Sequence, residues 1–136
     1  MDYELTTLVR DFLNFRNFDF QSNATIIGKN DRELSFSYLV DGSRDKTDFS
    51  GKIGVLVKDW SRSCGYNVII EAERLQENAP TLSKVMVVAN QFSGTARELA
   101  EKLGILTLTK GELISIREIY KNETSAFNDE KKAFDP

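Results

Sequence analysis

Two short apolar segments, separated by one helical segment, constrain the fold of this 136-residue chain more than any other feature. Residues 53–58 and 84–89 carry apolar side chains at nearly every position, which is typical of strands that are buried on both faces of a sheet. Between them, residues 67–78 repeat apolar side chains at helical spacing, and Pro80 then ends the helix. A strand, a helix and a second buried strand predict parallel pairing through a helical crossover.

The N-terminal part predicts a helix followed by a hairpin. Residues 2–16 have the apolar spacing of an amphipathic helix, and residues 19–29 form an extended segment that ends in a turn at Asn30 and Asp31. A second extended segment follows, in which apolar and polar side chains alternate. Period-two alternation predicts one face with Leu34, Phe36, Tyr38 and Val40, and another with Ser35, Ser37 and Leu39.

The C-terminal part predicts a helix, a short strand and a final helix. Ser93 or Thr95 caps the first of these helices, Gly104 ends it, and residues 105–108 form the strand. Thr109 and Glu112 then have the spacing of a capping box that opens the final helix. That helix is expected to turn four apolar side chains inward, namely Leu113, Ile116, Ile119 and Tyr120.

This order of elements predicts an α/β fold with a mixed central sheet of about five strands, flanked by helices on both faces. Residues 1–120 are expected to form a single domain, because the chain is long enough for one core without disulfides or metals. Residues 121–136 are polar and predict a C-terminal tail, although Phe127 and Phe134 could dock on the domain.

Composition and terminal sequence indicate the cellular compartment of the protein. Apolar residues make up 40% of the chain and charged residues 29%, as in ordinary soluble globular domains. Cys64 is the single cysteine, which excludes an internal disulfide and suits a reducing compartment. The N-terminus lacks the pattern of a signal peptide, and no segment approaches the roughly 20 apolar residues of a membrane span. We therefore expect a cytoplasmic protein with no membrane partner.

Composition also limits the chemistry. The chain has no histidine, which excludes Ser-His-Asp and Cys-His catalysis as well as histidine-bearing zinc sites. Any metal chemistry would use oxygen ligands, which favours magnesium, manganese or calcium. The net charge of −3 gives no overall basic field, so binding of a nucleic acid would depend on a local basic patch.

Lys58 is the first candidate for a functional residue. It ends the apolar segment 53–58, where an unpaired ammonium group would be costly, so its charge needs a partner or a ligand. Two alternatives are open: an ion pair with an acid such as Glu71, or contact with a phosphate. Trp60 and Arg62 follow closely and could stack on a base, although Trp60 could equally be a core or dimer-interface residue.

Several motifs together resemble one large nuclease superfamily. A late stretch is the most specific, with Asn90-Gln91-Phe92-Ser93, Ala96, Ala100, Gly104-Ile105 and Leu113. The earlier matches are Tyr3-Glu4, the hairpin stretch Asp31-Arg32-Glu33-Leu34-Ser35, and Leu56-Val57-Lys58 with Trp60. Over residues 3–113 the chain thus resembles the Mrr-type branch of the PD-(D/E)xK, or restriction-endonuclease-like, superfamily.

The resemblance implies a degenerate active site. Enzymes of that superfamily use two carboxylates around a divalent cation and a lysine beside the attacking water. Here the first acidic position falls at Ser35, with Ser37 on the same predicted face as the less favoured alternative, and the second falls at Leu56. Only Lys58 carries over. The resemblance therefore implies a nuclease-like protein that has lost metal-dependent phosphodiester hydrolysis and holds no metal or other cofactor.

Such a protein would act as a nucleic-acid-associated or interaction module. The expected contacts to DNA or RNA are Lys58, Trp60, Arg62 and Arg32. A homodimer is expected as well, since this fold often dimerises and the chain offers apolar contact surface at Trp60, Phe49 and the tail phenylalanines.

Two alternatives remain open. In the first, the protein is an active magnesium- or manganese-dependent nuclease whose carboxylates have migrated, with Glu71 or Glu73 and Asp31 or Glu33 as ligands. The same acids could equally be solvated surface residues or ion-pair partners. In the second, the chain is a structural scaffold subunit that binds no nucleic acid.

Overall fold

A mixed five-stranded sheet forms the centre of the molecule. The computed structural model describes residues 4–42 and 51–133, and the side chains of its last helix as far as Lys121. The strands are β1 (Asp19–Ile27), β2 (Glu33–Asp41), β3 (Lys52–Lys58), β4 (Lys84–Ala89) and β5 (Leu106–Thr109). They lie in the order β1-β2-β3-β4-β5, antiparallel from β1 to β3 and parallel from β3 to β5.

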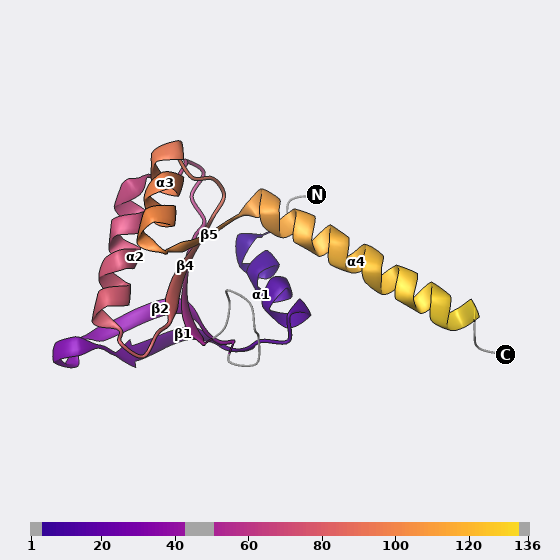
Figure 1. Ribbon diagram of the computed structural model, residues 1–136, viewed down its shortest axis with the longest axis horizontal. Coiled ribbons are helices and arrows are strands. Elements are labelled where there is room, and N and C mark those ends of the chain that lie inside the picture. Colours follow the sequence, from indigo (N-terminus) through magenta and orange to yellow (C-terminus); the bar gives the residue numbers. More distant parts are fainter. Residues whose placement is uncertain (1–3, 43–50, 134–136) are drawn as a thin grey trace.

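Helices cover both faces of this sheet. They are α1 (Leu5–Phe15), α2 (Tyr66–Asn78), α3 (Gly94–Leu103) and α4 (Lys110–Ala133), with a short 3₁₀ turn, η1 (Lys29–Asp31), in the β1–β2 hairpin. Figure 1 shows α2 and α3 on one side of the strands, and α1 with the start of α4 on the other. The predicted α/β fold, with a mixed sheet of five strands between helices, is confirmed.

Each face of the sheet has its own apolar core. We call the first the α2 core; its main members are Phe36, Leu56, Ile69, Ala72, Val85, Val87, Ala96 and Ala100. The second is the α1 core, which includes Leu8, Phe12, Tyr38, Ile53, Val55, Met86, Val88 and Leu113. Alternate side chains of β3 and β4 point into the two cores. This explains why both strands are apolar at nearly every position.

Local signals set the limits of the helices. The apolar stripe predicted for the first helix is fully buried in α1, from Leu5 to Leu13. Ser93 is the residue that caps α3, since its Oγ accepts a hydrogen bond from the Ala96 N–H at 3.1 Å. Gly104 ends α3 in the left-handed conformation (φ 71°), which glycine adopts without a steric penalty.

The predicted single apolar face of β2 is wrong. Phe36 packs in the α2 core, together with Leu34, whereas Tyr38 packs in the α1 core, together with Val40. The change of face occurs at Ser37, whose side-chain Oγ accepts the Val57 N–H of β3 at 3.0 Å. Burial still alternates along β2, with Leu34, Phe36, Tyr38 and Val40 all buried, but the two halves of the strand serve different cores. Asn23 of β1, opposite Ser37, has a positive φ of 51° and is missing from the paired register, which marks a local irregularity at this point.

The inward positions predicted in the last helix are partly wrong. Leu113 is buried, but Ile119 is 59% and Tyr120 38% exposed. Tyr120 stacks on Phe15 of α1, one turn after the ion pair between Arg117 and Asp11 at 3.1 Å. Ile119 lies six residues after the buried Leu113, about 120° from it around the helix, so it does not share the face of α4 that contacts α1. Figure 1 shows the remainder of α4 leading away from the sheet.

Helix α4 also runs through most of the segment predicted to be a tail, since it ends only at Ala133. The division at residue 120 into domain and tail stays a prediction. Within the described part of the chain, no helix is both long and apolar enough to cross a membrane.

The contact between Gly54 and the α2 core leads to a stability prediction. A Cβ atom on Gly54 would lie 2.6 Å from the ring of Phe36 and 2.9 Å from Leu82. Gly54→Ala should therefore lower the free energy of unfolding by about 1–3 kcal/mol through overpacking. Urea denaturation measures this loss. Gly94→Ala is the matched control, because nothing lies within 4 Å of that Cβ position; equal effects of the two variants would contradict the prediction.

Candidate functional site

Lys58 lies at the carboxyl end of β3 and faces α2. It shares this face with Leu56, which is buried in the α2 core. The Lys58 side chain is 22% exposed, and its Nζ lies 3.5 Å from Glu71 Oε1 in the second turn of α2. The ion pair that the sequence offered as one alternative for Lys58 is thus present, while its contact with a phosphate stays a prediction.

Two cations flank the indole of Trp60. Lys58 Nζ lies 5.6 Å from the ring centroid, and the guanidinium carbon of Arg62 lies 4.8 Å from it. Both distances fall within the range of cation–π attraction. The structure therefore brings together three of the predicted nucleic-acid contacts, and we call Lys58, Trp60 and Arg62 the cation–indole cluster.

Hydrogen bonds join the loop that follows β4 to the loop that follows β3, which carries Trp60 and Arg62. Asn90 Nδ2 donates hydrogen bonds to Asp59 Oδ1 at 3.0 Å and to the Trp60 carbonyl at 2.7 Å. Further along, the Cys64 N–H donates to the Gln91 carbonyl and the Ser93 N–H to the Cys64 carbonyl, which forms a short parallel bridge. The Asn90–Ser93 stretch noted in the sequence thus fixes the position of the cluster.

Cys64 is fully buried beneath these loops. Burial raises the pKa of its thiol above the ordinary value of 9.0, and the positive charges of Lys58 and Arg62 oppose this shift. A buried thiol with a raised pKa carries little thiolate near neutral pH, so the geometry supports a structural role for Cys64.

The position of Ser35 does not match the first acid of the nuclease site. Ser35 is exposed on β2, and its Oγ lies 3.4 Å from Thr25 Oγ1 of β1. Its neighbours Leu34 and Phe36 pack in the α2 core, so Ser35 points to the opposite face from Lys58. The structure therefore does not bring Ser35 to Lys58, whereas Ser37 does contact β3.

The four candidate metal ligands are also separated. Asp31 and Glu33 lie at the tip of the β1–β2 hairpin. This tip lies beside the C-terminal end of α2, as the close approach of Gly28 to the Asn78 backbone shows. Glu71 lies seven residues earlier on α2, which corresponds to about 10 Å along the helix axis.

Glu73 does not join Glu71 either, because residues two apart on a helix face in different directions. Among the residues that the structure describes, no group of three or more acidic or cysteine side chains is close enough to hold a metal ion. Arg32 lies at the hairpin tip as well, away from the cation–indole cluster.

A hollow of about 1090 Å³ lies beside this cluster, at the carboxyl ends of β4 and β5. Ser61 connects the two regions, and the other lining residues come from the loop after β4, from α3 and from the start of α4. Sequence reasoning missed this hollow. Its signal in the sequence is weak, since the polar residues that line it come from separate segments.

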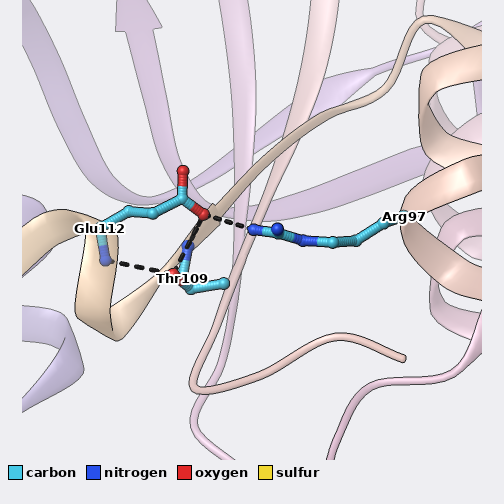
Figure 2. Close-up of polar contacts among 3 residues, drawn as sticks. All are labelled: Arg97, Thr109 and Glu112. Carbon is cyan, nitrogen blue, oxygen red and sulfur yellow. Dashed lines mark hydrogen bonds and ion pairs between the residues drawn. The ribbon is translucent and has the colours of Figure 1, made fainter. Parts of the chain in front are cut away.

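The predicted capping box forms one wall of the hollow. Glu112 N–H donates to Thr109 Oγ1 at 3.1 Å, and the Thr109 N–H and hydroxyl donate to Glu112 Oε1. Figure 2 shows that Arg97 reaches across from α3 and donates to the same carboxylate oxygen. The start of α4 is thereby tied to α3.

Comparison with known proteins supports the fold alone. No protein-family model and no curated protein matches the sequence. Among solved structures, the chain is similar to the crystal structure of a protein of unknown function, AF1548, with a TM-score of 0.67 and 13% sequence identity. The similarity covers 83% of this chain, and the chain spans 65% of that protein's length.

The buried thiol leads to a prediction on pH. Near neutral pH the thiol is almost fully protonated in both the folded and the unfolded state. Above neutral pH the unfolded chain loses its proton first, because the folded pKa of Cys64 is raised, so the stability present at neutral pH should decline as the pH rises through this range. Urea denaturation between about pH 7.5 and 9.5 measures this decline.

Cys64→Ala provides the comparison, because it removes the thiol and leaves every other titrating group in place. The variant should show a flatter pH dependence, even if its stability is lower at every pH. Parallel curves for the two proteins would contradict the assignment.

Proposed function

We propose that this chain is a nuclease-like domain that binds DNA or RNA and has lost metal-dependent phosphodiester hydrolysis. The observation that carries the proposal is the cation–indole cluster at the carboxyl end of β3, with Lys58 at the position that the resemblance assigns to the catalytic lysine. The proposed setting is the cytoplasm, where a single reduced cysteine is expected.

The chemistry of the cluster suits a nucleic-acid strand. An indole stacks on any base, and adjacent cations neutralise phosphates, which together give affinity without sequence preference. Arg62 lies over the Trp60 ring, with its guanidinium carbon 4.8 Å from the ring centroid, and is itself exposed, so its charge can reach a phosphate. Since the net charge of the chain is −3, attraction of phosphate must come from this local group.

Two features support the loss of hydrolysis. Leu56 occupies the second acidic position and is 6% exposed, so its side chain serves the α2 core. At the first position, Ser35 lies on the opposite face from Lys58, as its alternation with Leu34 and Phe36 indicates. Magnesium sheds its water reluctantly and generally needs anionic ligands, which neither residue supplies.

Binding to an oligonucleotide tests the proposal. Arg62→Ala and Trp60→Ala should each weaken the binding of a labelled DNA or RNA strand, and the loss for Trp60 should be about 1–3 kcal/mol for one stacked base. Affinity should also fall as salt rises, because bound phosphates release counterions. Fluorescence anisotropy measures both effects.

Lys102→Ala is the matched control, since it removes an exposed cation from the end of α3 without touching the cluster. No binding of either nucleic acid at about 50 mM salt would contradict the proposal and favour the scaffold subunit.

The ion pair between Lys58 and Glu71 favours a second candidate function. A carboxylate that reaches the lysine from α2 is the arrangement expected if the second acid had migrated onto the helix. In that case the protein would be a magnesium- or manganese-dependent nuclease, with Glu71 as a metal ligand and Lys58 positioning the attacking water.

A cleavage assay distinguishes the two functions. If the protein has lost hydrolysis, plasmid or single-stranded DNA should stay intact when it is incubated with the protein and Mn²⁺. Calorimetry should then show no binding of Mn²⁺ to the protein. Cleavage that is abolished by Lys58→Ala and Glu71→Ala would establish the second candidate instead. Glu77→Ala, an exposed acid of the same helix, is the control for nonspecific loss of charge.

A homodimer remains part of the proposal. Trp60 is half-buried and could contribute to such an interface. Phe49 and Phe134 lie outside the described residues, and the side chain of Phe127 lies outside them as well.

A further inference from the structure

The chain leaves β4 and β5 toward opposite faces of the sheet. After β4 it enters α3, whose Ala96 and Ala100 pack in the α2 core. After β5 it enters α4 directly, and Leu113 of α4 packs in the α1 core. A gap opens where the chain leaves adjacent parallel strands toward opposite faces, and ligands of open α/β sheets bind in crevices outside the carboxyl ends of the strands.

The hollow described above is this crevice. Its residues come from the loop after β4, from the first turns of α4, and from Arg97 on α3. Its volume of about 1090 Å³ slightly exceeds the sizes typical of small-molecule sites, about 300–1,000 Å³, so a small organic molecule fits within it. Neither Lys58 nor Arg62 lines it, so it is a separate site from the cation–indole cluster.

The charges in the crevice favour an anion. Arg97, Lys110 and Glu112 leave one net positive charge, and Arg97 is already engaged with Glu112 (Figure 2). In the described part of the chain, no ion pair engages the Lys110 ammonium. Lys110 is thus the cation that is available to a ligand.

The backbone beside Lys110 favours a phosphate group. Gly111 has no side chain, and a Cβ placed there would have only Thr109 Oγ1 near it, at 4.0 Å. A bulky anion can therefore approach the backbone closely at this point. A lysine ammonium beside an accessible backbone is a common way to bind a phosphate as a point charge.

The remaining walls offer both apolar and hydrogen-bonding groups to an organic molecule. Phe92, Ile114 and Ile116 are half-buried and present apolar surface, while Gln91 and Ser115 offer hydrogen-bonding groups. Gln91 Oε1 already accepts the Ser63 hydroxyl at 3.2 Å, which leaves the amide NH₂ group to donate to a ligand. In small-molecule sites, apolar side chains pack against the body of the ligand and a few polar groups fix its orientation.

We infer that this crevice binds a nucleoside monophosphate group, with the phosphate at Lys110 and Gly111 and the base against Phe92 and Ile114. The group can be a free nucleotide or the 5′-phosphorylated end of a nucleic acid. The inference goes beyond the proposed function, because it rests on different residues and a different part of the sheet edge.

Isothermal titration of the full chain with AMP, CMP, GMP and UMP tests the inference. At least one monophosphate should bind, and adenosine and the other unphosphorylated nucleosides should bind at least tenfold more weakly. Lys110→Ala should lower the affinity at least tenfold. Lys121→Ala, an exposed lysine further along the same helix, should leave it unchanged.

Lys110→Gln serves if Lys110→Ala does not fold, because it keeps the length of the side chain and removes the charge. Tighter binding of a 5′-phosphorylated than of a 5′-hydroxyl oligonucleotide, lost in the Lys110 variant, identifies a nucleic-acid end as the ligand. Equal binding of the two oligonucleotides, with retained binding of a monophosphate, identifies a free nucleotide.

The two proposals fail separately. Arg62→Ala should weaken strand binding through the cation–indole cluster and leave monophosphate binding intact, whereas the Lys110 variants should weaken monophosphate binding and leave the binding of a 5′-hydroxyl strand intact. The inference is overturned if no monophosphate binds at millimolar concentration, if nucleosides bind equally well, or if both Lys110 variants bind like the unaltered chain.

Discussion

The burial of β3 and β4 on both faces is the constraint on which the rest of the structure depends. Residues of β3 such as Val55 and Leu56 point into different cores, so the sheet must be covered on each side. A parallel pair covered on both sides requires helical connections, and the ends of these connections meet at the carboxyl edge of the sheet. Both candidate sites lie on that edge for this reason.

The two sites at this edge are built in different ways. The cation–indole cluster depends on hydrogen bonds between two loops, in which Asn90 holds Asp59 and the Trp60 backbone. The crevice depends instead on the divergence of α3 and α4, and on the bond network of Arg97, Thr109 and Glu112 that joins them. Ser61 lies between the two, so the sites adjoin each other along the edge of the sheet.

Local signals in the sequence were sufficient for most of the fold. Ser93, Gly104 and the pair Thr109 and Glu112 marked helix ends correctly, because caps depend on hydrogen bonds within a few residues. Prediction failed where distant contacts decide the outcome. Phe36 and Tyr38 of β2 pack in different cores beside an irregular position of β1, Asn23. Ile119 is exposed because it lies off the face of α4 that contacts α1.

The sequence by itself determined the element order, the burial of β3 and β4, and the proximity of Trp60 and Arg62 to Lys58, since these follow from periodicity and short spacing. Only the tertiary structure decided that Glu71 pairs with Lys58, that Ser35 and the hairpin acids lie elsewhere, and that a crevice opens between α3 and α4. The physical reason is that such contacts join segments far apart in the chain, whose relative positions depend on how the helices pack on the two faces of the sheet.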